Sequence, residues 1–205
     1  DTGTLVLNGI TASRNVARTN GGFMYSTGTV TIHNATISNN SANMGGGVYL
    51  YEGATTNIYS TEFSRNKSTD NGGGLFVYTY GTPTVVNGCT FNKNVADGVG
   101  GAAYVSGKSI AYFYDITATG NQATTGGFLY ETAADTELTL VKLTVSQNTA
   151  DKGSIIWGNT TNAKLKLDKS KFTDLDYGTI DNAYWSLAIN GSLTVEEITG
   201  KVPSI

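Results

Sequence analysis

Side chains suited to acid, base or nucleophilic chemistry are few in this sequence of 205 residues. Its one histidine, His33, and one cysteine, Cys89, are too small an inventory for a disulfide framework, a zinc cluster or a Cys–His dyad. His33 directly follows the apolar residue Ile32 where related segments carry asparagine, which indicates a turn residue. Cys89 occupies a position held by Ile10 and Leu143 elsewhere, which indicates a buried small apolar residue rather than a reactive thiol.

Carboxylates could support cleavage of a polysaccharide, either as an acid–base pair or around calcium. The candidates lie on turns or near the end of the chain: Asp70, Asp97, Asp151, Asp168, Asp174 and Asp176. Asp70, Asp97 and Asp151 share one turn position of the repeat, but Thr124 holds that position in the repeat between Asp97 and Asp151. No long insertion is present that could form a cleft. We therefore expect solvated turn residues and no enzyme, with no catalytic residue, cofactor or metal site, while a structural calcium ion is left open.

Aromatic side chains form the most regular group with binding potential. One position of a repeated phrase holds Tyr25, Tyr49, Phe76, Tyr104, Tyr130 and Trp157, and Tyr51 and Tyr78 follow two of these at a spacing of two. The residue before each aromatic is apolar and is predicted to face the core. Because successive side chains of a strand point to opposite faces, the aromatic residues are predicted to face outward.

These eight aromatic residues are our candidate ligand-binding residues. In the middle repeats the residue two before the aromatic is small (Gly47, Gly74 and Ala102), so we expect the rings to stand beside bare backbone as a shallow apolar strip. Contiguous exposed apolar patches often mark binding sites. Two other interpretations stay open. Aromatic rings on successive coils, ~4.8 Å apart, could simply stack on one another. Alternatively, the rings could be buried.

The phrase that contains these aromatics reads apolar-x-x-Asn-x-Ala, then three or four residues, then Gly-Gly-x-apolar-aromatic. Its anchoring asparagines are spaced by 25 to 28 residues and are Asn15, Asn40, Asn66, Asn94, Asn121 and Asn148. A period in this range is typical of a solenoid. Each repeat is therefore expected to form one coil.

Each coil is predicted to contain three short strands and three turns. Alternating segments such as Val30 to Ile37 and turn signals such as Asn8-Gly9 indicate strands and turns, and no apolar stripe of helical period is present. Parallel pairing of equivalent strands would stack identical positions, and the asparagines would satisfy turn backbone and bond to one another. The predicted fold is all-β, a parallel β-helix of about eight coils of 24–28 residues with three short parallel sheets.

The repeat continues far enough to predict one domain over residues 1–205. It decays near the end, where Leu175 replaces the asparagine, and residues 176–205 are predicted to be degenerate last coils. Because the sequence opens directly on the strand-like segment Thr4 to Leu7, we expect it to be a piece of a longer surface protein.

Charge and hydrophobicity argue against two classes of partner, nucleic acids and the membrane interior. Charged residues make up 14% of the sequence and the formal net charge is −3, so the basic surface expected of a nucleic-acid-binding protein is missing. No apolar stretch has the length of a membrane span, and we expect no membrane insertion.

Two motifs carry a family resemblance. Phe63-Ser64-Arg65-Asn66 and Phe91-Asn92-Lys93-Asn94, with Gly100-Gly101-Ala102, resemble the repeats of the polymorphic membrane proteins of chlamydiae and the adhesin-like proteins of methanogenic archaea. The resemblance covers about residues 10 to 175. It implies a right-handed parallel β-helix displayed at a cell surface and involved in adhesion.

The sequence thus favours an adhesin-like binding module that is extracellular, at the cell surface. Its expected partner is a protein or glycan on a host or neighbouring cell. One alternative is a structural stalk that displays another domain, since the coils are uniform. A polysaccharide-degrading lyase or hydrolase is the second alternative.

Overall fold

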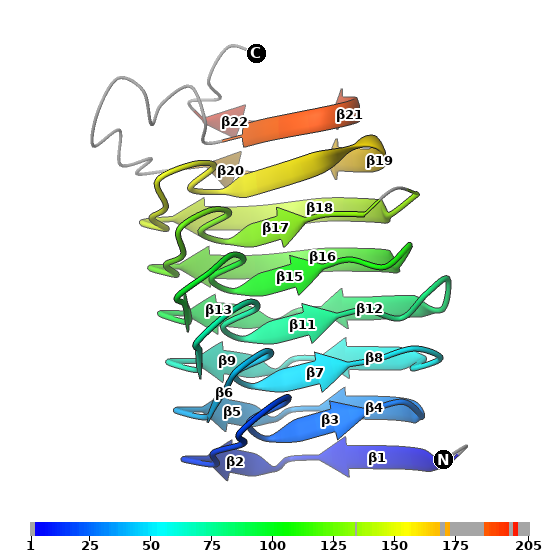
Figure 1. The fold of residues 1–205 in the computed structure, drawn as a ribbon, viewed down its shortest axis with the longest axis vertical. Coiled ribbons are helices and arrows are strands. Elements are labelled where there is room, and N and C mark those ends of the chain that lie inside the picture. Colours follow the sequence, from blue (N-terminus) through cyan, green and yellow to red (C-terminus); the bar gives the residue numbers. More distant parts are fainter. Residues whose placement is uncertain (1–2, 134, 169–170, 173–186, 197–198, 201–205) are drawn as a thin grey trace.

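The chain winds into coils that stack along one axis, with the first coil at one end and β21 and β22 at the other (Figure 1). This computed structural model describes residues 3–133, 135–168, 171–172, 187–196 and 199–200, with side chains described as far as residue 158. Every regular element in those residues is a strand.

The first strand of each coil forms the longest stack. In order along the axis it consists of β1 (Thr4–Asn8), β4 (Thr29–His33), β8 (Thr56–Tyr59), β12 (Pro83–Asn87), β16 (Ile110–Thr119), β18 (Glu137–Ser146), β19 (Ile156–Asp168) and β21 (Leu187–Glu196). All neighbours in this stack pair in parallel. The register places repeat positions on one another, as with Leu7 beside Ile32.

Two further stacks complete the coil. The second contains β2 (Thr11–Ser13), β5 (Thr36–Ser38), β9 (Glu62–Ser64), β13 (Thr90–Asn92), the ends of β16 and β18, β20 (Lys171–Phe172) and β22 (Thr199–Gly200). The third contains β3 (Met24–Ser26), β7 (Val48–Leu50), β11 (Leu75–Val77), β15 (Ala103–Val105), β17 (Leu129–Glu131) and the starts of β19 and β21. A short extra ladder joins β6 (Ser41–Ala42), β10 (Lys67–Ser68) and β14 (Val95–Ala96).

This architecture is a parallel β-helix with three parallel sheets, as the sequence predicts. The number of coils differs, because about six turns are complete among the described residues where about eight were expected. Each complete turn contains one asparagine of the repeat, and the last of these is Asn148. The degenerate coils predicted for residues 176–205 lie largely outside the described residues, as do Asp174 and Asp176.

Apolar side chains fill the interior in columns. The first sheet contributes a fully buried column of Ile32, Ile58, Val86, Phe113 and Leu140. The second contributes a similar column of Ile37, Phe63, Phe91, Ala118 and Val145. Like residues therefore stack on like: the rings of Phe63 and Phe91 are parallel, with centroids 4.8 Å apart.

A buried ladder of asparagines joins the coils at the turn after the second sheet. The Oδ1 atom of Asn94 accepts hydrogen bonds from the backbone N–H and from Nδ2 of Asn66, both at 3.0 Å. Nδ2 of Asn94 donates to Oδ1 of Asn121 at 3.0 Å and to the carbonyl oxygen of Phe63 at 2.9 Å. The same bonds join Asn15 through Asn148, and every member is buried except Asn15 in the first coil, so the predicted inward ladder is confirmed.

The paired glycines of the repeat have two separate causes. Gly72 has a φ of +67°, and a Cβ there would lie 2.8 Å from the carbonyl oxygen of Leu75. A Cβ at Gly73 would instead collide with the carbonyl oxygen of Gly101 in the next coil. The first glycine therefore permits the turn within a coil, and the second permits close approach between coils.

We expect Asn94→Ala to lower the free energy of unfolding by roughly 1–3 kcal/mol, because buried polar groups of Asn66, Asn121 and Phe63 lose their partner. Urea unfolding measures this loss. Asn92→Ala is the matched control, since Asn92 lies two residues earlier on the outer side of β13 and is only partly buried. Equal stability of the Asn94 variant and the unmodified chain would show that the ladder does not hold the coils together.

Candidate functional site

The aromatic strip, defined as Tyr25, Tyr49, Tyr51, Phe76, Tyr78, Tyr104, Tyr130 and Trp157, follows the third sheet. Six of these residues occupy the second position of a strand in that sheet. The preceding residues, such as Val48 and Leu75, are fully buried in the core, whereas the aromatic residues lie outside the core cluster. The predicted outward orientation is confirmed.

Stacking between coils organises the main column of the strip. Ring centroids are 5.4 Å apart for Tyr25 and Tyr49, 4.4 Å for Tyr49 and Phe76, 4.4 Å for Phe76 and Tyr104, and 5.7 Å for Tyr104 and Tyr130. The rings of each pair lie within 28° of parallel. Such pairs stabilise a fold by about 0.5–1.5 kcal/mol each beyond the area that they bury. Self-stacking, one of the interpretations left open by the sequence, is thus present.

Exposure along the strip differs from the expected open patch. Tyr49 and Phe76 are only 5% exposed, whereas Tyr25 is 48% exposed. The reason is that each inner ring is covered on both faces by the rings of neighbouring coils. The inner part of the strip therefore presents ring edges and phenol hydroxyls to the surface, and not ring faces.

The residues beside the rings also differ from the expectation. Gly47, Gly74 and Ala102 were predicted to lie beside the rings, but this position faces inward: Ala102 is fully buried and Phe128, its equivalent, packs in the core. Side chains alternate between inward and outward only within the strand, and the strand begins one residue after this position, as β11 begins at Leu75 after Gly74. The first glycine of the pair lies beside the ring instead, since a Cβ at Gly72 would be 3.1 Å from Cβ of Phe76.

A second column widens the strip at its middle. The rings of Tyr51 and Tyr78 stack with centroids 5.4 Å apart and planes 11° from parallel. The ring centroid of Tyr51 also lies 6.1 Å from the ring centroids of both Tyr25 and Tyr49. Gly107 packs against the Tyr78 ring, because a Cβ there would come within 2.6 Å of the ring carbons.

Three phenols of the strip, those of Tyr49, Tyr51 and Tyr104, have raised pKa values. The pKa of Tyr49 is raised to about 12, mainly by burial. The neighbouring phenols add to this effect, and they are those of Tyr25, Tyr51, Tyr78 and Tyr104. Burial is also the main cause that raises the pKa of Tyr104. The charge of the Glu52 carboxylate, which directly follows Tyr51 in the sequence, is the main cause that raises the pKa of Tyr51.

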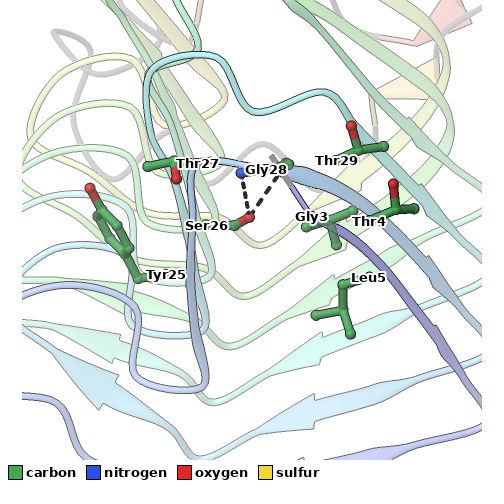
Figure 2. Close-up of a pocket in the computed structure, with 9 residues that line it drawn as sticks. Gly3, Thr4, Leu5, Tyr25, Ser26, Thr27, Gly28 and Thr29 are labelled. Carbon is green, nitrogen blue, oxygen red and sulfur yellow. Dashed lines mark hydrogen bonds between the residues drawn. The ribbon is translucent and has the colours of Figure 1, made fainter. Parts of the chain in front are cut away.

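An open hollow lies next to Tyr25, where the first coil meets the second. Figure 2 shows that its lining consists of small side chains and backbone, with Tyr25 at one side and Leu5 at another. The hydroxyl of Ser26 accepts a hydrogen bond from the backbone N–H of Gly28 at 3.2 Å, which closes the turn beside the hollow. No charged side chain contributes to this lining.

The carboxylates considered for catalysis are spread over several coils, and in the described part of the chain Asp97 and Asp151 line one hollow with Thr124 of the coil between them. Asp97 forms an ion pair with Lys67 at 3.1 Å between exposed side chains, and Asp151 is exposed. Asp70 is partly buried, and its carbonyl oxygen accepts the backbone N–H of Gly98. The side chain of Asp168 is not among those described. Among the described residues, no three His, Cys, Asp or Glu side chains are grouped so that they could hold a metal ion.

The remaining reactive side chains have structural surroundings. Cys89 is 1% exposed, and burial raises the pKa of its thiol to about 11, so the prediction of a buried small residue is confirmed. His33 ends β4 instead of lying in the following turn, and its ring stacks on Tyr59 with centroids 4.9 Å apart.

Sequence reasoning missed two residues that support the strip. Glu52 could have been found, because an acidic residue directly follows Tyr51. No sequence signal points to the contact of Gly107 with Tyr78, since it joins loops of different length in successive coils.

Comparison with known proteins gives one match. A protein family described as "right handed beta helix region" matches residues 3–172. Searches of curated proteins and of solved structures found no match. Within the residues described, no helix is long and apolar enough to cross a membrane.

We expect the free energy of unfolding to fall as the pH rises from about 10 to about 12, because Tyr49 ionises near pH 10 when unfolded and near pH 12 when folded. The stability that depends on protonated Tyr49 is fully present below about pH 10, and it is lost as the pH rises through about 12 because the unfolded state releases the proton first. Tyr49→Phe should make the decline shallower in denaturant titrations across this range. Tyr80→Phe, which changes an exposed tyrosine outside the strip, is the matched control. An equally steep decline in the Tyr49 variant would contradict this assignment.

Proposed function

We infer that this chain, which belongs to the right-handed β-helix family, is an adhesin-like binding module displayed extracellularly at a cell surface. The fold is compatible with adhesins, with stalks and with polysaccharide-degrading enzymes. The observation that favours binding is the continuous aromatic strip on one sheet. Its proposed partner is a protein or glycan on a host or neighbouring cell.

The chemistry of the strip suits recognition of a macromolecule. Tyrosine is enriched in binding surfaces because one ring supplies both apolar area and a hydroxyl, and its few rotatable bonds make it inexpensive to order. Here the stacked rings are already held in place by their neighbours, as with Tyr51 and Tyr78. A partner would therefore meet a preordered surface and lose little additional conformational freedom on binding.

The geometry favours a protein surface over a sugar as the occupant. Sugars pack best on open ring faces, and the faces of Tyr49 and Phe76 are covered by neighbouring rings. Ring edges and phenol hydroxyls remain, and both can contact backbone amides and apolar side chains of a partner protein.

A stalk is the second candidate function, and the asparagine ladder favours it. Ladder hydrogen bonds continue without interruption from Asn15 to Asn148, which suits a rigid spacer. In that case the strip would serve only to stabilise the stack. Binding assays with the isolated chain separate the two functions.

We propose that the chain has no catalytic activity. Asp97 and Asp151 line one hollow, but Thr124 lies on the coil between them and Asp97 is paired with Lys67. A product assay on a panel of polysaccharides, with and without calcium, tests this. Turnover that is lost on replacing Asp70 or Asp97 would favour the enzyme.

We expect the double variant Tyr51→Ser with Tyr78→Ser to bind at least about tenfold more weakly to those cells or surface glycans that the unmodified chain binds, as loss of central interface residues commonly does. Fluorescence binding assays on a panel of cell types and a glycan array measure this. Tyr80→Ser is the matched control, because Tyr80 is 58% exposed and lies outside the strip.

Thermal unfolding accompanies each assay, since removing two stacked rings also removes packing. If the serine variant unfolds, Tyr51→Phe with Tyr78→Phe keeps the rings and removes only the hydroxyls. Full binding by a folded serine variant would exclude the strip as the site. An unmodified chain that binds nothing on the panel would favour the stalk.

A further inference from the structure

Tyr51 lies at the centre of a cluster of four tyrosines. Its ring centroid is 5.4 Å from that of Tyr78 and 6.1 Å from those of Tyr25 and Tyr49. The phenols of this cluster also lie close enough to raise the pKa of Tyr49. Phenols in this arrangement can react with one another and not only with a partner.

The Tyr51 and Tyr78 pair combines proximity with access. Both side chains are partly exposed, and both residues directly follow a strand, β7 or β11, so they are not fixed by strand geometry on their C-terminal side. The turn at Gly53, with a φ of +81°, comes shortly after Tyr51. A small oxidant can reach these rings, and their stacked arrangement keeps the two phenols close together.

A proton acceptor lies close to Tyr51. The Glu52 carboxylate follows Tyr51 directly in the sequence, and its charge is the main cause that raises the pKa of the Tyr51 phenol. One-electron oxidation of a phenol releases the hydroxyl proton, and an adjacent carboxylate can take that proton as the electron leaves. This distinguishes Tyr51 from the other members of the cluster.

We propose that Tyr51 and Tyr78 form an oxidative cross-linking site, at which a peroxidase using hydrogen peroxide joins the two rings as dityrosine. Each phenol gives up one electron and its hydroxyl proton. The two radicals couple through ring carbons next to the hydroxyls, and the hydrogens on those carbons move to the phenol oxygens. Hydrogen peroxide takes up the two electrons and two protons and becomes two molecules of water.

The product would be a covalent bond between successive coils. Tyr51 follows β7 and Tyr78 follows β11, and these strands are neighbours in the third sheet. A bond at this point would restrain the separation of two coils in addition to the asparagine ladder. The inference does not depend on whether the strip also binds a partner.

Two other sites serve as internal controls. Tyr80 is more exposed, at 58%, but has no ring contact among the described residues, so exposure alone predicts cross-links between chains at Tyr80. Tyr112 and Tyr114 lie 6.0 Å apart on the same strand, β16, where the strand holds both residues in place. Tyr51 and Tyr78 instead belong to successive coils and lie just beyond β7 and β11, so their proximity and access favour a bond between coils.

The test treats the folded chain with peroxidase and hydrogen peroxide, digests it and identifies the products by mass spectrometry. We expect an intrachain peptide pair joining Tyr51 to Tyr78 that lacks two hydrogen atoms. Tyr51→Phe and Tyr78→Phe each keep the stacked rings and should reduce dityrosine fluorescence severalfold. Glu52→Gln should slow its formation without changing the residues joined, and Tyr80→Phe should leave the intrachain product unchanged.

Three results would overturn the proposal. One is a folded chain that yields no dityrosine, and another is a product found only between chains at Tyr80. The third is an intrachain yield that is equal in the unmodified chain, in Tyr51→Phe and in the chain unfolded by urea. The phenylalanine variants keep the rings, so circular dichroism should show an unchanged fold.

Discussion

The hydrogen bonds between buried asparagine side chains are the interaction on which this structure depends. In each of the four inner asparagines the amide oxygen accepts two hydrogen bonds from the coil before it, as that of Asn94 does from Asn66. The amide nitrogen of each inner asparagine donates forward to the next asparagine and back to a buried carbonyl oxygen, as that of Asn94 does. Because these bonds require one asparagine directly above another, they hold successive coils in register, and stability becomes a sum over neighbouring coils.

The register of the coils also creates the aromatic strip. Once equivalent residues lie about one strand spacing, ~4.8 Å, apart, outward aromatic residues on successive coils must stack. The second glycine of the pair, as at Gly73, lets successive coils approach closely, and the first, as at Gly72, leaves the rings without a bulky neighbour. The strip therefore contributes to stability and presents a preordered row of ring edges and hydroxyls. The proposed binding and cross-linking both use this consequence of the fold.

Much of the fold could be predicted from the sequence because period and register are directly visible in it. The spacing of the asparagines predicts the coils, and the buried neighbours of the aromatic residues, such as Leu75, predict which way the rings point. The coverage of Tyr49 and Phe76 could not be predicted, since it depends on how rings tilt against rings above and below. The inward position of Gly74 was missed because the strand begins one residue later than simple alternation assumes. The residues that would bind a partner stay a prediction, as a repeat pattern specifies packing and not a ligand.

Native-state amide hydrogen exchange tests the role of the asparagine ladder most directly. The backbone N–H of Asn66 lies in a turn and donates to a side-chain oxygen, that of Asn94, at 3.0 Å. If the ladder holds the coils together, this amide exchanges as slowly as the amide of Leu75 in β11, through opening of the whole stack. Exchange as fast as that of Tyr80 in its exposed turn would show that the ladder opens locally, and it would contradict this account.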